Sequence, residues 1–159
     1  MSQPTHRNRF NALLGIEVVQ LQRDGCVMQL HIRPDLHNSL EGVVHGGVTN
    51  TLADVAMGHA AVPPVDGVQQ CVTVESKINY LSPAIGELLV VEARVLKRGR
   101  NLIVTDARIT CDGKLVAVSS GTYARVNPER WGRGAEMPAA KETPAAKEMP
   151  AAELKGKQP

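Results

Sequence analysis

Alternating apolar and polar residues, separated by short turn signals, cover most of the chain up to residue 126. Alternation with a period of two is typical of strands with one buried face, and aspartate followed by glycine marks tight turns. Such turns occur at Asp24-Gly25 and Asp112-Gly113. The pattern predicts six strands, at residues 15–22, 26–33, 70–81, 87–98, 101–111 and 114–126. Only turn signals separate the last four, which indicates an antiparallel meander.

One long helix is predicted between the second and the third strand. Side chains suited to a core recur there at the offsets of one helical face, namely Val48, Leu52, Val55, His59 and Val62. We expect the helix from about residue 46 to residue 61, because Pro63-Pro64 follows and ends it. A short helix is also expected around residues 5–14.

The order of these elements, two strands, one helix and four strands, predicts an α+β fold. One helix cannot cover both faces of a six-stranded sheet, so we expect a curved antiparallel sheet wrapped around one long central helix. The other face of the sheet then needs a cover, which a second copy of the chain would supply. We therefore expect a homo-oligomer, either a dimer or a dimer of dimers.

The C-terminal stretch differs from the rest, because a six-residue unit repeats three times from Glu136 onward with a proline in each unit. Proline blocks a continuous helix, and few large apolar residues are present to form a core. We expect a folded domain over residues 1–131 and a disordered low-complexity tail over residues 132–159.

Composition limits the partners. The net charge is +2, and only 3% of the residues are aromatic, so nucleic acid is not expected as a partner. No apolar stretch reaches membrane-spanning length, and the first residues lack the apolar stretch of a signal peptide, which predicts no membrane partner and a cytoplasmic location. Three well-separated cysteines are interpreted as small buried hydrophobes, not as a disulfide framework or zinc site: Cys26, Cys71 and Cys111.

The candidate chemistry lies on a second stripe of the predicted helix, where Asp54 stands among mostly tiny side chains. A lone aspartate is usually an ordinary exposed residue. Here, however, Gly46 and Gly47 begin the helix without side chains. A ligand can therefore approach the unpaired N–H groups of the first turn, where the helix dipole is positive. An oxyanion or a polarised carbonyl would suit that position.

The histidines of this region give weaker signals. His45 is explained equally well by an ordinary loop hydrogen bond and by a chemical role. His45, Asp54 and His59 are spaced so that they do not share one helical face. We expect no metal and no cofactor.

The segment over residues 38–54, which contains Asn38, Gly42, His45-Gly46-Gly47 and Asp54, resembles the hotdog-fold thioesterases of the phenylacetate-pathway type. Residues 72–84 are similar to the strand that follows the helix in that family. The resemblance extends over about residues 13–126 and excludes the tail. It implies a hotdog fold, an acyl-CoA thioesterase, and an active site at a dimer interface. Such a site implies that Asp54 and Gly46 are contributed by different subunits.

The resemblance also implies roles for single residues. Asp54 matches the family's catalytic carboxylate, which acts either as the nucleophile or as the base that activates water. Gly46 matches the glycine whose N–H polarises the thioester carbonyl. His45 and Asn38 match polar residues beside the thioester, and Thr73 stands where some relatives place a serine near the water.

Two assignments leave alternatives open. Asn38 lies seven residues before His45, where the family spacing is usually six. Either the loop bulges by one residue, or Ser39 takes the role of the polar residue beside the thioester. Ser39 and Gly47 are candidates for contacts with the substrate. The phosphates of the coenzyme need cations, and the basic cluster at the Gly99 turn is a candidate for binding them: Lys97, Arg98 and Arg100. A solvated hairpin turn explains this cluster equally well.

Three other functions fit the sequence less well than acyl-CoA hydrolysis. A non-catalytic acyl-CoA-binding module would use the same cleft, but it has no need for the carboxylate of Asp54. The differently spaced histidine and acid of hotdog hydratases are not found. A serine hydrolase would need a Gly-x-Ser-x-Gly motif, which does not occur.

Overall fold

The structure, a computed structural model, describes residues 8–127 of the chain. The predicted tail over residues 132–159 and the domain boundary before it lie outside the described residues. Within residues 8–127, no helix is both long enough and apolar enough to cross a membrane.

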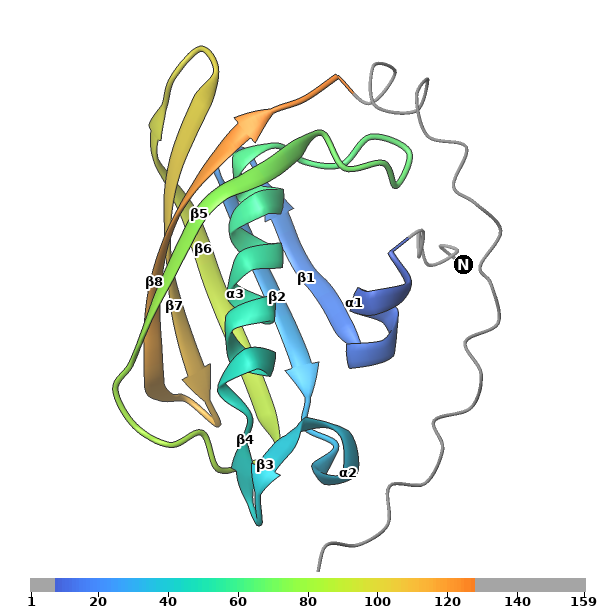
Figure 1. Ribbon diagram of the computed structural model, residues 1–159, viewed down its shortest axis with the longest axis vertical. Helices are drawn as coiled ribbons and strands as arrows, with labels where there is room; N and C mark the ends of the chain where they lie inside the picture. Colours follow the sequence, from blue (N-terminus) through green and yellow to red (C-terminus); the bar gives the residue numbers. More distant parts are fainter. Residues whose placement is uncertain (1–7, 128–159) are drawn as a thin grey trace, which may run out of the picture.

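A six-stranded antiparallel sheet curves around the long helix α3 (Gly46–Ala61), as Figure 1 shows. The strand order across the sheet is β1-β2-β6-β7-β8-β5. Its members are β1 (Ile16–Gln22), β2 (Gly25–His31), β5 (Cys71–Tyr80), β6 (Leu88–Arg98), β7 (Leu102–Cys111) and β8 (Lys114–Arg125). The predicted α+β arrangement is confirmed, and every predicted strand is present to within two residues at either end.

The predicted meander is wrong at β5. Strands β6, β7 and β8 are consecutive neighbours, but β5 pairs with β8 and forms an edge of the sheet. Strands β5 and β6 are thus three strand spacings apart, about 14 Å. The connection over residues 81–87 can span this distance, because an extended residue covers more than about 3 Å. The turn signal between β5 and β6 therefore marks a connection across the sheet and not a hairpin between neighbouring strands.

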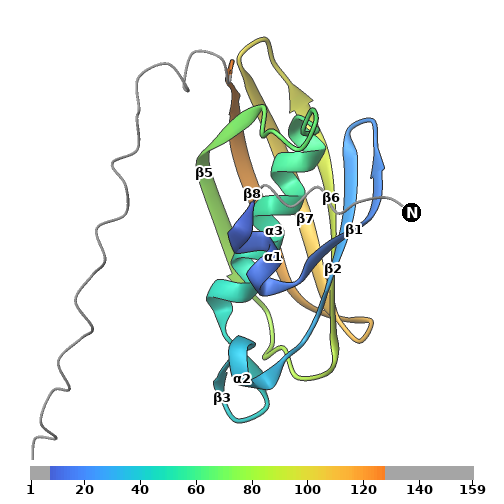
Figure 2. The same cartoon turned by 90° about the vertical axis from the view of Figure 1, so that its right-hand side faces the viewer.

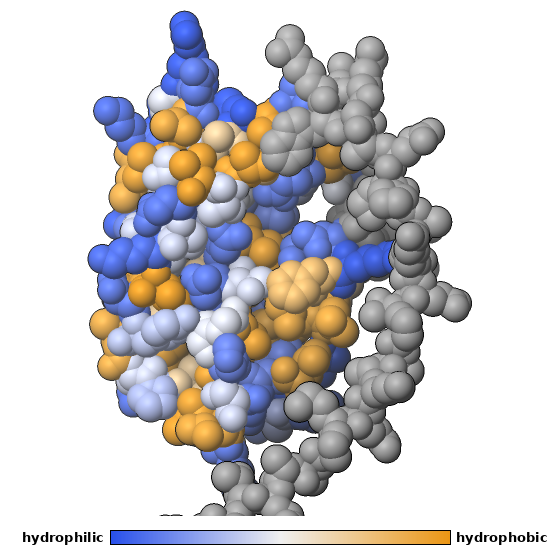
Figure 3. Space-filling model, in the orientation of Figure 1, coloured by the Kyte–Doolittle hydropathy of each residue, from blue (hydrophilic) through white to orange (hydrophobic). Residues whose placement is uncertain are grey.

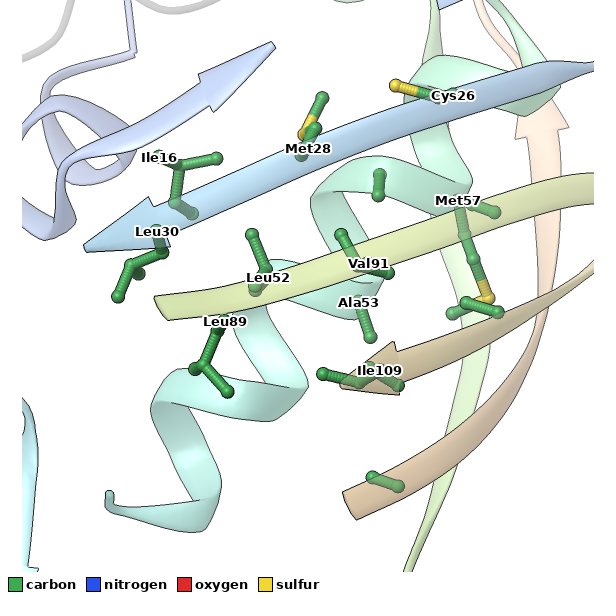
Figure 4. Close-up of a cluster of buried hydrophobic side chains, with 14 of the residues drawn as sticks. Ile16, Cys26, Met28, Leu30, Leu52, Ala53, Met57, Leu89, Val91 and Ile109 are labelled. Carbon is green, nitrogen blue, oxygen red and sulfur yellow. The ribbon is translucent and has the colours of Figure 1, made fainter. Parts of the chain in front are cut away.

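The core lies between α3 and the concave face of the sheet, where Leu52, Ala53 and Met57 of the helix lie among Val91 and Ile109 of the strands (Figure 4). All five side chains are fully buried. The three cysteines are buried as predicted: Cys26, Cys71 and Cys111.

The predicted core stripe of α3 is only partly right. Val48 and Leu52 are buried, but Val55 and His59 are half-buried at the side of the helix. The face against the sheet also carries small buried residues, namely Thr49, Ala53, Ala56 and Ala60. Small side chains let the sheet approach the helix backbone closely, and a pattern based on large apolar residues misses them.

Three short elements at the N-terminal end of α3 were not predicted: α2 (Pro34–His37), β3 (Asn38–Leu40) and β4 (Val43–Val44). Pro34 starts α2, and Gly42 adopts a positive φ of 75° in the turn between β3 and β4. Figure 2 shows α2 and β3 beneath the first turn of α3. The expected N-terminal helix is present as α1 (Arg9–Leu14).

The two faces of the domain differ in polarity. On the outer face of the sheet, Arg94 and Asp106 form an ion pair at 2.8 Å, and Glu92 and Arg108 are exposed. This face therefore carries charged side chains, and the homo-oligomer that would cover it stays a prediction. On the side that carries α3, apolar side chains gather around α1 (Figure 3), where Phe10 is 56% exposed.

Candidate active site

His45 connects β4 to α3 and is the N-cap residue of the helix. Its Nδ1 accepts a hydrogen bond from the Gly47 N–H at 2.8 Å, and its carbonyl accepts one from the Val48 N–H at 2.9 Å. Because Nδ1 accepts, the neutral ring carries its proton on Nε2. The imidazole therefore caps the helix and offers an N–H donor on its other side.

Gly46 provides the first N–H group of α3. No hydrogen-bond partner for this N–H occurs among residues 8–127, whereas Gly47 and Val48 both have one. A Cβ at Gly46 would lie 3.0 Å from Cζ and Oη of Tyr80, and the Tyr80 hydroxyl donates to the Gly46 carbonyl at 2.7 Å. A side chain at this position would therefore crowd the ring. Its N–H, at the positive end of the helix dipole, suits an oxyanion.

Two cavities flank the first turn of α3. The larger, about 480 Å³, is lined by Gly46, Tyr80 and Ser39 together with apolar residues of the loop after β5. The smaller, about 350 Å³, is lined by Asn38, His45 and apolar side chains of α1 and α2. Asp54 lines neither cavity.

The spacing of Asn38 is explained by a bulge in the small hairpin. Asn38 pairs with Val44 and Leu40 pairs with Val43, so Ser39 is the extra residue of strand β3. Asn38 consequently lines the same cavity as His45, whereas Ser39 lines the cavity beside Gly46. The Oδ1 atom of Asn38 is buried and has no hydrogen-bond partner among residues 8–127. Of the two alternatives, the geometry is that of a one-residue bulge.

Asp54 lies two turns further along α3 and is half-buried. Its Oδ1 accepts two hydrogen bonds, from the Tyr123 hydroxyl of β8 at 2.8 Å and from the Thr73 hydroxyl of β5 at 3.0 Å. Burial, and then the charge of Asp54, raise the pKa of Tyr123, so its phenol stays protonated and donates. Thr73 thus lies beside the carboxylate.

The structure does not bring Gly46 and Asp54 of one chain together. They are eight residues apart on the same helix. At 1.5 Å per residue this separation is about 12 Å along the helix axis. One thioester cannot reach both groups within a single chain, because attack on a carbonyl needs a distance of roughly 3 Å.

Comparisons with known proteins identify the family of this chain. The thioesterase superfamily model matches residues 41–118. A putative esterase of Saccharolobus solfataricus is 32% identical over 111 residues, which make up 69% of this chain and 78% of that protein. Human acyl-coenzyme A thioesterase 13 is 33% identical over 117 residues, 71% of this chain and 82% of the human protein. The chain belongs to the thioesterase superfamily.

Solved structures support the same assignment. A conserved protein of Pseudomonas aeruginosa matches this thioesterase with a TM-score of 0.68 at 32% identity, over 79% of this chain and 100% of its own. The phenylacetic acid degradation protein PaaI of Thermus thermophilus, in a mutant form, matches with a TM-score of 0.63 at 26% identity, over 75% and 100%. The expected hotdog fold and the enzyme class, a thioester hydrolase, are confirmed.

The predicted phosphate cluster of the thioesterase divides into two parts. Arg98 donates from Nε to Asp24 at 2.9 Å and from Nη1 to the Ala61 carbonyl at 2.7 Å. Its guanidinium therefore pairs with a backbone carbonyl that the C-terminal end of α3 leaves free. Arg98 therefore has partners within the chain, which favours a structural role over the predicted contact with the substrate. Lys97 and Arg100 are exposed.

Sequence reasoning missed Tyr80 and Tyr123 of this thioesterase. Tyr80 contacts Gly46 from 34 residues away, and Tyr123 contacts Asp54 from 69 residues away. The available signal was that both tyrosines occur in predicted strands of a chain with only two tyrosines. A buried tyrosine hydroxyl needs a partner.

Proposed function

We propose that this thioesterase hydrolyses acyl-CoA to a free acid and CoA. The observation that supports the proposal is the Asp54 carboxylate, which two hydroxyls hold in place on a helix whose Gly46 N–H has no partner among residues 8–127. A carboxylate and an N–H donor at a helix start are the two groups that attack on a thioester carbonyl needs.

The reaction adds one water molecule to the thioester. The Gly46 N–H stabilises the oxyanion that forms on the carbonyl oxygen. Asp54 either attacks the carbonyl carbon or removes a proton from water, whose oxygen attacks instead. The C–S bond then breaks and the thiolate of CoA takes up a proton. In the first route, water hydrolyses the acyl anhydride and regenerates the carboxylate.

A homodimer would complete the site. Thr73, near one end of edge strand β5, contacts Asp54, and Tyr80, at its other end, contacts Gly46. If two β5 strands pair antiparallel about a two-fold axis near the middle of the strand, Asp54 of one subunit faces Gly46 of the other. This pairing would also satisfy the open edge of the sheet. A dimer of dimers would retain the same sites.

Further contacts with the substrate follow from the same arrangement. Asn38, His45 and Gly47 line the smaller cavity and Ser39 the larger, which supports contacts between these residues and groups on either side of the thioester. Lys97 and Arg100 are the candidates for the phosphates of CoA. The expected cytoplasmic location stays a prediction.

The test measures thiol release from acyl-CoAs with short, medium, long and aryl acyl groups. Asp54→Asn keeps an acceptor for Tyr123 and Thr73 but removes the charge, and it should lower kcat by about 100-fold or more. Wild-type rates in Asp54→Asn would refute the proposal, and tight acyl-CoA binding without turnover would favour the binding module.

The composite site is tested by mixing two inactive variants. Asp54→Asn and Gly46→Pro damage different halves, so each mixed dimer keeps one intact site. With random assembly, about a quarter of the wild-type activity should return. No recovery in mixtures that contain the mixed dimer would refute the shared site while leaving the hydrolase proposal standing.

A further inference from the structure

The two oxygens of the Asp54 carboxylate have different surroundings. Oδ1 accepts from the Tyr123 hydroxyl at 2.8 Å and from the Thr73 hydroxyl at 3.0 Å. Among residues 8–127, no hydrogen bond or ion pair to Oδ2 occurs. An oxygen with two donors is held in place and its lone pairs are occupied, so Oδ2 is the oxygen available for chemistry.

Tyr123 is placed under Asp54 by its packing. The side chain is 1% exposed, and its ring lies between two glycines. A Cβ at Gly58 of α3 would lie 3.4 Å from Cε1 of the ring, and a Cβ at Gly121 of β8 would lie 2.9 Å from Cε2. The hydroxyl also lies 3.0 Å from the backbone carbonyl of Asp54. The ring therefore has one position, which fixes the hydroxyl against α3.

We propose that Tyr123 is a positioning residue, which together with Thr73 holds Oδ1 of Asp54 and leaves Oδ2 to react with the thioester or with water. This inference rests on the proposed thioester hydrolysis. Tyr123 touches no substrate and acts through the carboxylate.

The experiment compares kcat and KM of the wild type and Tyr123→Phe. The phenylalanine keeps the ring between the two glycines and removes only the hydroxyl. We expect kcat to fall by about 10-fold, since a hydrogen bond to a charged group is lost, with KM nearly unchanged. Thr105→Val is the matched control, because it removes a buried hydroxyl that bonds the Gly121 carbonyl.

Two further variants keep the inference testable if Tyr123→Phe does not fold. Thr73→Val removes the other donor to Oδ1 and should lower kcat in the same way, with KM nearly unchanged, whereas Thr73→Ser should restore kcat. Wild-type kcat in Tyr123→Phe, while Asp54→Asn is inactive, would overturn the positioning role and leave the hydrolase standing. A wild type that hydrolyses no acyl-CoA would overturn both.

Discussion

The Gly46 N–H can be deleted without removing the helix that carries it. Proline has no N–H and is well tolerated at the first position of a helix. The preceding residue, His45, has ψ of 132°, which lies in the range that a following proline favours. Gly46→Pro should therefore keep the first turn of α3 and lose the donor proposed to polarise the thioester.

The size of the effect follows from two separate losses. Any side chain at Gly46 places a Cβ 3.0 Å from Tyr80, which must shift and weaken its 2.7 Å hydrogen bond to the Gly46 carbonyl. That loss costs about 0.5–1.5 kcal/mol of stability. Gly46→Ala has this loss alone. Gly46→Pro also loses the oxyanion donor, which is worth about 100- to 1,000-fold in kcat.

Steady-state thiol release and urea unfolding of the three proteins separate these effects. The two variants should have similar free energies of unfolding, and Gly46→Pro should be at least about 100-fold slower than Gly46→Ala in kcat. Equal kcat values for alanine and proline would contradict the role of the N–H. A proline variant that unfolds much more readily than the alanine variant would show that the helix start itself had changed.

The remaining predictions concern stability and binding. Leu52→Ala should lower the free energy of unfolding by about 2–5 kcal/mol in urea denaturation, because the side chain is fully buried. Arg98→Ala should lower the melting temperature without raising KM, whereas Lys97→Ala should raise KM for acyl-CoA at unchanged stability. Burial lowers the pKa of His37 and His59, so the unfolded chain binds protons more readily. Stability should then fall as pH drops below about 6.5, with a slope that His37→Gln reduces.

Most of the fold could be predicted because it depends on local patterns. The strand alternation and the Asp24-Gly25 turn act over a few residues, and the structure matches both. The partner of β5 could not be predicted in this way, because Cys71 pairs with Arg125 across 54 positions of sequence. Alternation identifies a strand and its buried face, but it contains no information on which neighbour that strand selects.

The candidate site shows the same division between local and distant information. The first turn of α3 is local, so His45-Gly46-Gly47 and Asp54 could be proposed from a short segment of sequence. Their partners Tyr80 and Tyr123 were missed, because each reaches the helix from a distant strand. The partners of Arg98 are distant too: its charge suggested a phosphate, whereas it donates to Asp24 and to the end of α3.

Edge strand β5 links the two halves of the site. Thr73 and Tyr80 face α3 from the same strand, and each fixes a group proposed to act on the thioester: Thr73 holds Asp54, and Tyr80 lies against Gly46. Because these contacts are seven residues apart along the strand, they keep the two groups apart within one chain. In an antiparallel copy of β5 the order of the two contacts is reversed, so Asp54 of one chain would lie opposite Gly46 of the other. The seven-residue spacing thus leaves the proposed site incomplete in one chain and would complete it in two.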